Sequence, residues 1–275
     1  MDKNKVKGML WGLIVGDAFG SPIQFSTKDG HKWLSEMEDC PVFNLPKGYW
    51  TDDGSMALCI IDSYIRQRDY DLKDIARTFA KWYFDGYLSS VPGRSFDVGG
   101  ATQESIIAFH RSGNLVNGSE ESQGNGSIMR LAPSYLIARY KNEPAIMHEV
   151  SDLTHASARV RQVVDRFAKI LDEHFSGLKT SEVSPYKTRN DVNNSGWAVS
   201  TLDAALWAFN TTDTFEKGLI DAVNLGGDSD TIGAVYGQLA GAYYGFNAIP
   251  SRWIREVKTC GEINNMIDNF IAMLE

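Results

Sequence analysis

Two acidic clusters are the residues of this sequence best suited to chemistry. Residues 51–53 (Thr-Asp-Asp) and 228–231 (Asp-Ser-Asp-Thr) each combine two carboxylates with a threonine hydroxyl, and each comes just before an apolar run with helical spacing. If the clusters face each other in the fold, they offer only oxygen ligands, which hard divalent ions such as Mg²⁺ and Mn²⁺ prefer. The pair therefore predicts a two-metal hydrolytic site.

Helix capping is the simpler explanation of these clusters. Asp, Ser and Thr are common helix caps, and acids near a helix N-terminus are favoured by the helix dipole. Capping accounts for one carboxylate in each cluster, but two neighbouring carboxylates repel, which pushes one of them toward protonation. Because a bound cation relieves this repulsion, the sequence favours metal binding over capping alone.

A glycine-rich turn at residues 124–130 (Gly-Asn-Gly-Ser-Ile-Met-Arg) leads into another apolar run. Glycines permit close approach of a ligand, and the free N–H groups at a helix start can bind a phosphate or diphosphate. A structural turn capped by Ser127 explains the pattern at least as well. The turn is neither a P-loop nor a GxGxxG fingerprint.

Three further residues each allow two interpretations. Asp17, which precedes Ala-Phe-Gly, is interpreted as a helix-end hydrogen-bonding residue in preference to a catalytic one. Asp97, in a turn followed by two glycines, suits an Asx turn and a catalytic carboxylate equally well. His155 is by default a buried, hydrogen-bonded histidine.

The elements that must position these residues are helices. Apolar residues recur at helical spacing along most of the chain, and convincing hairpin signals are lacking, which predicts an all-α protein. The expected helical segments are 6–15, 56–66, 72–83, 102–110, 128–139, 144–153, 160–174, 201–209, 215–224, 232–244 and 262–274. Polar stretches at 26–48, 115–126 and 177–196 are expected to be loops.

One expected helix carries a glycine repeat, formed by Gly233, Gly237, Gly241 and Gly245. Residues four apart share a helix face, so this face lacks side chains and lets another backbone come close. Each mid-helix glycine costs about 1 kcal/mol relative to alanine, and tight packing must offset that cost. We therefore expect this helix at the centre of the domain, holding Asp228 and Asp230 rigidly at its N-terminal end.

Composition restricts the class of protein. A chain of 275 residues with 43% hydrophobic and 23% charged residues suits one compact domain, 1–275. The formal net charge of −8 argues against a nucleic-acid partner. Three widely spaced cysteines indicate a reducing compartment, and no stretch approaches a membrane span, so we expect a cytoplasmic protein without a membrane partner. We expect a monomer, although the sequence does not set the oligomeric state.

Several ordered motifs together resemble the ADP-ribosylglycohydrolase family. They are GDAFGSPIQF, YWTDDGSMAL, GNGSIMRLAP, LTHAS, SGWAVSTLDAALWAF and GGDSDTIGAVYGQLAGAYYG, and the similarity runs from Gly8 to about Tyr244. The resemblance implies a single all-α domain with a central glycine-rich helix and two Mg²⁺ or Mn²⁺ ions at the base of a cleft. It also implies hydrolysis of an α-linked N- or O-glycosidic bond at C1 of ribose.

The resemblance also assigns roles to residues of this chain. The implied metal ligands are Thr51, Asp52, Asp53, Asp228, Asp230 and Thr231. The implied diphosphate loop consists of Gly124, Asn125, Gly126, Ser127, Ile128 and Met129, and His155 would contact the nucleotide. We expect Asp53 to orient the attacking water and Asp97 to assist proton transfer.

Two positions depart from the family pattern. Gln24, which we include among the substrate-binding residues, stands where many relatives carry a glutamate. Glutamine keeps hydrogen bonding but cannot transfer a proton at neutral pH. Gly54 replaces the threonine that commonly follows the two aspartates, which removes a hydroxyl near the metal ligands.

The sequence leaves several functions open. We expect an enzyme that removes ADP-ribose from a modified protein, above all from arginine. Variants of this function would act on O-linked ADP-ribose or on a free ADP-ribosyl metabolite. A non-catalytic ADP-ribose-binding protein and a two-metal phosphohydrolase remain as alternatives.

Overall fold

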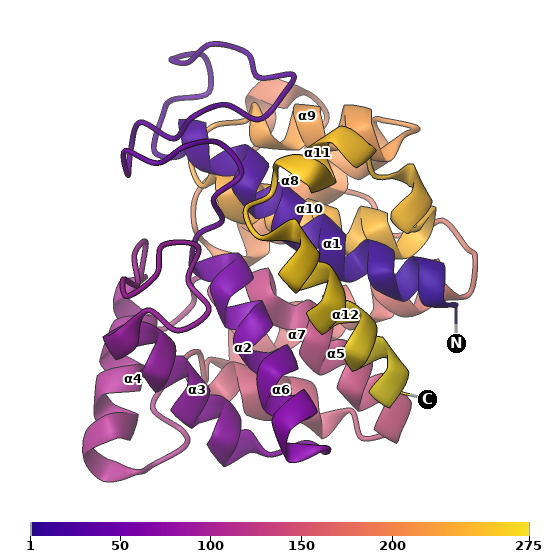
Figure 1. The fold of residues 1–275 in the computed structure, drawn as a ribbon. Coiled ribbons are helices and arrows are strands. Elements are labelled where there is room, and N and C mark those ends of the chain that lie inside the picture. Colours follow the sequence, from indigo (N-terminus) through magenta and orange to yellow (C-terminus); the bar gives the residue numbers. More distant parts are fainter. Residues whose placement is uncertain (1, 275) are drawn as a thin grey trace.

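An antiparallel pair of helices, α1 (Lys3–Gly20) and α10 (Ser229–Tyr244), runs through the middle of the protein (Figure 1). The computed structural model describes residues 2–274. In α10 the residues from Ser229 to Ala242 are all buried, and in α1 those from Gly8 to Gly20 are. The prediction that the glycine-rich helix lies at the centre is therefore confirmed.

Glycines on both helices allow this pair to pack backbone against backbone. A Cβ atom added to Gly16 would lie 2.0 Å from the carbonyl oxygen of Gly233, and one added to Gly8 would lie 2.5 Å from that of Gly241. Real side chains cannot occupy such positions, so glycine is required on both faces. The partner helix expected for the glycine repeat is thus α1, the N-terminal helix.

Ten further α-helices surround this pair in residues 2–274. They are α2 (Asp52–Gln67), α3 (Leu72–Asp85), α4 (Gly100–Ser112), α5 (Leu131–Lys141), α6 (Ala145–Asp152), α7 (Ala158–Phe175), α8 (Ala198–Asn210), α9 (Phe215–Val223), α11 (Ser251–Glu256) and α12 (Cys260–Met273). Short 3-10 turns lie at Ser21–Ile23, Ile128–Arg130, Arg189–Asp191 and Phe246–Ala248. No β-strand occurs in these residues, which confirms the all-α prediction.

The prediction of a helix over 128–139 was wrong for its first turn. Residues Ile128–Arg130 form a 3-10 turn, and α5 begins only at Leu131. The cause is Gln238 of α10, whose Nε2 donates to the carbonyls of Ile128 (3.1 Å) and Met129 (2.8 Å) while its Oε1 accepts from the Ala132 N–H (2.8 Å). This buried side chain replaces part of the α-helical bonding and fixes the glycine-rich turn against α10.

The other expected helices are present with ends shifted by a few residues. The three cysteines are free thiols. None of the helices in residues 2–274 is long and apolar enough to cross a membrane. Helix α11 was not expected from the sequence, because its six residues are too few to show a periodic pattern.

Candidate functional site

The two acidic clusters lie against each other at the N-terminal ends of α2 and α10. Thr231 Oγ1 is 3.4 Å from Asp53 Oδ2, and Thr51 Oγ1 is 3.5 Å from Asp230 Oδ2. Asp52 and Asp53 occupy the first turn of α2, so this helix begins earlier than the expected residue 56. Segments almost 180 positions apart therefore form one group of carboxylates and hydroxyls.

Capping does not explain these carboxylates. The residues at the two N-cap positions are Thr51 and Asp228, and within the described residues neither side chain accepts a capping hydrogen bond. The N-terminus of α2 is bonded instead by Asp17 of α1, which accepts from the N–H groups of Thr51 (2.9 Å) and Gly54 (2.8 Å) and from the Thr51 hydroxyl (2.9 Å). Asp17 is thus a hydrogen-bonding residue in the last turn of α1, and its partners lie at the start of α2.

The carboxylates of this group have raised pKa values, because they are buried and lie close to one another. Burial raises the pKa of Asp17 to about 7 and that of Asp228 to about 6. Burial, followed by repulsion from neighbouring aspartates, raises the pKa of Asp52, Asp53 and Asp230 well above the ordinary range. Gathered charges of one sign are costly in a buried place unless a counter-charge binds.

Asp97 completes the acidic group from a strained position. Its backbone is left-handed (φ 59°), a conformation that aspartate tolerates better than most residues. Its side chain contacts Gln24 and Asp230; burial raises its pKa, and these two contacts partly offset the rise. Gln24 itself is 3% exposed, and its amide atoms make no hydrogen bond of normal geometry in the described residues. The structure thus places Asp97 beside the acidic clusters and not in an isolated turn.

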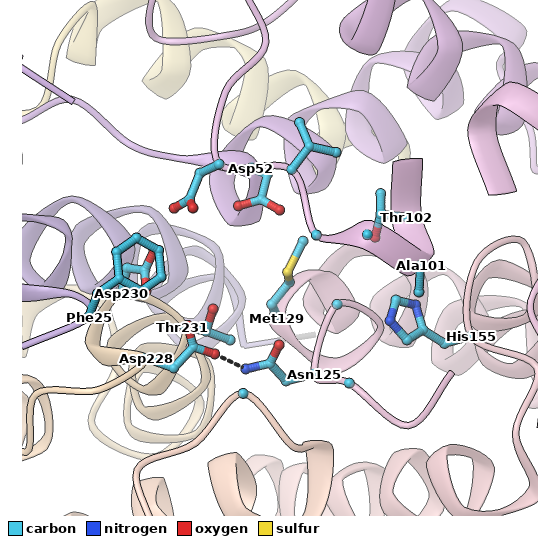
Figure 2. Close-up of a pocket in the computed structure, with 17 residues that line it drawn as sticks. Phe25, Asp52, Ala101, Thr102, Asn125, Met129, His155, Asp228, Asp230 and Thr231 are labelled. Atoms are coloured by element: carbon cyan, nitrogen blue, oxygen red, sulfur yellow. Dashed lines mark hydrogen bonds between the residues drawn. The ribbon is translucent and has the colours of Figure 1, made fainter. Parts of the chain in front are cut away.

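A pocket of about 380 Å³ opens above these residues (Figure 2). Figure 2 shows the carboxylates of Asp52, Asp228 and Asp230 on one side of the pocket and His155 on the other, with Asn125 between them. The Asn125 amide donates to Asp228 and, at 3.0 Å, to Thr201. The volume is within the range of ligand-binding pockets.

The glycine-rich turn forms the floor between the acidic group and His155. A Cβ atom on Gly126 would lie 2.6 Å from Cε1 of His155, and one on Gly124 would lie 3.5 Å from its Nε2. Neither glycine has a positive φ; Gly126 makes room for the imidazole, whereas a Cβ on Gly124 would be in ordinary contact with it. In residues 2–274 no backbone carbonyl accepts from the N–H of Gly126 or Ser127.

Not every expected site residue lines the pocket with its side chain. The pocket is lined by Asp52, Asp97, Gly124, Asn125, Gly126, Met129, His155, Asp228, Asp230 and Thr231 among the expected residues. Thr51, Asp53 and Gln24 lie directly behind them. Ser127 donates its hydroxyl to Ser151 (2.6 Å) and Ile128 is wholly buried, so these two residues could reach a ligand only through their backbones.

The sequence reasoning missed other lining residues. Phe25 is 67% exposed at the pocket, with a left-handed backbone (φ 64°), and its N–H donates to the Gly227 carbonyl at 2.6 Å. The start of α4 contributes Gly100, Ala101 and Thr102. The helix expected over 102–110 lacked this first turn; the glycine-flanked turn at Asp97 could have indicated it, since that turn leads directly into α4.

The residues present suit divalent cations chemically. The oxygens Asp53 Oδ1 and Asp230 Oδ1 are buried without a hydrogen-bond partner in the described residues. Together with the two threonine hydroxyls, these carboxylates form an all-oxygen donor set, which suits Mg²⁺ or Mn²⁺ and not zinc. No group of three or more His, Cys, Asp or Glu side chains in residues 2–274 is arranged to hold a metal ion as it stands.

The fold and the site define a class of protein. The family model for ADP-ribosylglycohydrolase matches residues 1–275, and the chain belongs to this family, hydrolases that act on ADP-ribose linkages. The chain is 34% identical to the ADP-ribosylarginine hydrolase Tri1 of Pseudomonas putida (strain GB-1), covering 92% of this chain and 74% of that protein. It is 30% identical to the ADP-ribosyl-[dinitrogen reductase] glycohydrolase of Rhodospirillum rubrum, covering 98% and 96%.

A solved structure described as an ADP-ribosylglycohydrolase-related protein complex shares the fold. It superimposes with a TM-score of 0.83 at 33% sequence identity, and the match covers 99% of both chains. The family expected from the sequence motifs is therefore confirmed.

Proposed function

We propose that this protein is a metal-dependent hydrolase that cleaves the glycosidic bond between ADP-ribose and an arginine of a modified protein. The observation that carries the proposal is the meeting of the two acidic clusters beneath a pocket whose floor is the glycine-rich turn. The similarity to two relatives named for ADP-ribosylarginine and for ADP-ribosylated dinitrogen reductase supports this substrate class.

The carboxylates and hydroxyls would hold two Mg²⁺ or Mn²⁺ ions. The proposed ligands are Thr51, Asp52, Asp53, Asp228, Asp230 and Thr231, and the unpaired oxygens of Asp53 and Asp230 support this assignment. Such ions supply a water of lowered pKa and orient the ribose hydroxyls. Because the carboxylates do not form a closed cage as they stand, we propose that binding draws them together.

Two carboxylates would act on the reacting atoms. Asp53, whose Oδ1 is unpaired, would accept a hydrogen bond from the attacking water and fix its direction. Asp97 would move a proton at the leaving nitrogen, since burial raises its pKa and brings its protonated form closer to neutral pH. The positive charge that develops at C1 of ribose would be stabilised by the surrounding carboxylates.

The opposite side of the pocket would bind the ADP-ribosyl group. The N–H groups of Gly126 and Ser127 can donate to the diphosphate, as N–H groups at helix starts commonly do. His155 would contact the nucleotide from the pocket wall. A guanidinium leaving group would suit Asp97, the one aspartate lining the pocket in the described residues that is not assigned to a metal ion.

The residue at position 24 supports alternatives to the arginine substrate. Gln24, a departure from the glutamate that the family resemblance implies, lies beside Asp97, and its amide cannot transfer a proton at neutral pH. O-linked ADP-ribose, a free ADP-ribosyl metabolite and non-catalytic ADP-ribose binding are therefore the alternatives to arginine deADP-ribosylation.

The test is product analysis on a panel of ADP-ribosyl-arginine, ADP-ribosyl-serine and ADP-ribosyl-asparagine. We expect intact ADP-ribose from the arginine substrate with Mg²⁺ and none after chelation. Release of AMP or phosphate would show a phosphohydrolase. Release of ADP-ribose from the serine substrate alone would show a serine-linked specificity. Tight binding without turnover would show a binding protein.

A further inference from the structure

Arg130, the last residue of the glycine-rich turn, is a buried cation whose side chain folds back against the turn. It is 1% exposed, and its guanidinium donates to the carbonyl of Gly126 and, at 2.7 Å, to the hydroxyl of Thr154. Its guanidinium also lies 4.9 Å from the centre of the Phe79 ring. Burial lowers its pKa to about 10, so the group remains cationic at neutral pH. Such a costly residue in the interior calls for a role beyond packing.

The hydroxyl of Thr154 connects this cation to His155. Thr154 Oγ1 lies 2.7 Å from Nδ1 of His155, and Thr154 is 1% exposed. Arginine can only donate, so the hydroxyl oxygen accepts from Arg130 and has its own proton left to place. Nδ1 of the imidazole is within hydrogen-bonding distance and can accept this proton. This geometry favours an Nδ1 without a proton and a neutral ring protonated on Nε2, since an Nδ1–H would leave the hydroxyl proton of Thr154 without an acceptor in the described residues.

We propose that Arg130 and Thr154 form a relay that fixes His155 as its Nε2–H tautomer, so that Nε2–H donates to an acceptor atom of the bound ADP-ribosyl group. The Nε2 atom lies at the glycine-rich turn, 3.1 Å from the position of a Cβ on Gly126, and His155 lines the pocket. Arg130 and Thr154 are thus positioning residues. This inference deepens the proposed function and rests on it for the identity of the ligand.

The same arrangement keeps the imidazole neutral. Burial, and then the charge of Arg130, lower the pKa of His155 to about 3. A neutral ring has one donor and one acceptor, so the direction of the Thr154 bond decides which nitrogen serves the ligand. The relay also holds the turn itself, because the Arg130 guanidinium donates to both the Gly126 carbonyl and the Thr154 hydroxyl.

The test measures the tautomer and the binding of ADP-ribose separately. Side-chain ¹⁵N NMR, with His155→Gln to assign the signal, reports which nitrogen carries the proton in the free protein. Calorimetry with ADP-ribose and Mg²⁺ then reports binding for wild type, Thr154→Val and Thr154→Ser. Thr78→Val is the matched control, since the buried Thr78 hydroxyl also accepts from an arginine, Arg66 (2.9 Å), on another part of the protein.

We expect the Nε2–H tautomer in wild type and in Thr154→Ser. Thr154→Val should lose this preference and weaken ADP-ribose binding about 10- to 100-fold, the range for losing a hydrogen bond to a charged group. Thr78→Val should change neither. An Nδ1–H tautomer in wild type, or unchanged binding by Thr154→Val, would overturn the relay. A wild-type protein that does not bind ADP-ribose would overturn the proposed function instead. The NMR measurement of the protonated nitrogen of His155 would still test the relay in that case.

Discussion

Gly12 of α1 and Gly237 of α10 touch each other backbone to backbone in the centre of the protein. A Cβ atom added to Gly12 would lie 2.1 Å from the Gly237 carbonyl oxygen, and one added to Gly237 would lie 1.9 Å from that of Gly12. Because α10 begins at the acidic cluster and α1 carries Asp17, this contact sets the distance between the elements that hold the site.

The first prediction concerns this contact. Gly12→Ala should destabilise the protein by about 2 to 4 kcal/mol, since the backbone of α10 cannot move aside as a side chain could. Helix propensity alone predicts the opposite sign, a gain of about 1 kcal/mol. Gly261→Ala is the control, because a Cβ at this exposed position in α12 would meet nothing within 4 Å. Denaturant unfolding of both variants measures the difference; a Gly12→Ala variant as stable as Gly261→Ala would refute the packing argument.

The second prediction concerns Asp230. Burial and four neighbouring aspartates raise its pKa, so Asp230→Asn should raise the melting temperature of the metal-free protein. The same substitution should lower turnover by a factor on the order of 100 or more and reduce the stabilisation that Mg²⁺ gives to wild type. Thermal unfolding with and without chelator checks the stability, and ADP-ribose release checks the rate. Full activity of Asp230→Asn would remove the residue from the mechanism.

A third prediction concerns Gln24. A glutamate at this 3% exposed position adds a carboxylate beside Asp97, so Gln24→Glu should lower the melting temperature of the metal-free protein and change kcat or linkage preference. The loss of stability should shrink in an Asp97→Asn background, where the repulsion is gone. An additive double-mutant cycle, together with an unaltered kinetic profile, would show that the position is neutral.

The pH dependence of stability can be tested at His174, far from the acidic clusters. Burial lowers the pKa of this histidine from 6.5 to about 4, while its Nδ1 bonds the Leu239 carbonyl at 2.8 Å. The unfolded chain therefore binds a proton more readily than the folded one between these pH values. Stability is fully present above pH 6.5 and is lost as the pH falls toward 4.

Between pH 7 and pH 5 this loss amounts to about 2 kcal/mol for one histidine. The His174→Gln variant cannot take up the proton, so its free energy of unfolding should fall by that much less than wild type over the same interval. Urea unfolding at the two pH values supplies the measurement. Parallel pH profiles for the two proteins would contradict the assigned shift.

The sequence predicted the helices and the two clusters because local periodicity and residue types carry that information. It predicted that the glycine repeat of α10 admits another backbone, but not which one, although Gly8, Gly12, Gly16 and Gly20 share the same spacing. Pairing between segments more than 200 residues apart leaves no local signal. The left-handed backbones of Phe25 and Asp97 also could not be predicted, because residues other than glycine rarely adopt this conformation.

The role of the glycine-rich turn shows a second limit. Gly124 and Gly126 were read as allowing a ligand to approach, whereas the structure shows that Gly126 also makes room for His155. Residue type shows that space is needed, but only the fold shows what fills it. For Asp17 the sequence indicated a hydrogen-bonding role but not its partners, because Thr51 and Gly54 lie beyond a long loop.

The central claim is that the two acidic clusters together hold a pair of divalent cations. The most direct measurement is the stoichiometry of Mn²⁺ binding to chelator-treated protein, followed by the EPR signal of the free ion. We predict two saturable Mn²⁺ ions per chain in wild type and fewer than two in Asp230→Asn. A wild-type protein that binds no Mn²⁺, or an Asp230→Asn variant that binds it as wild type does, would contradict the account.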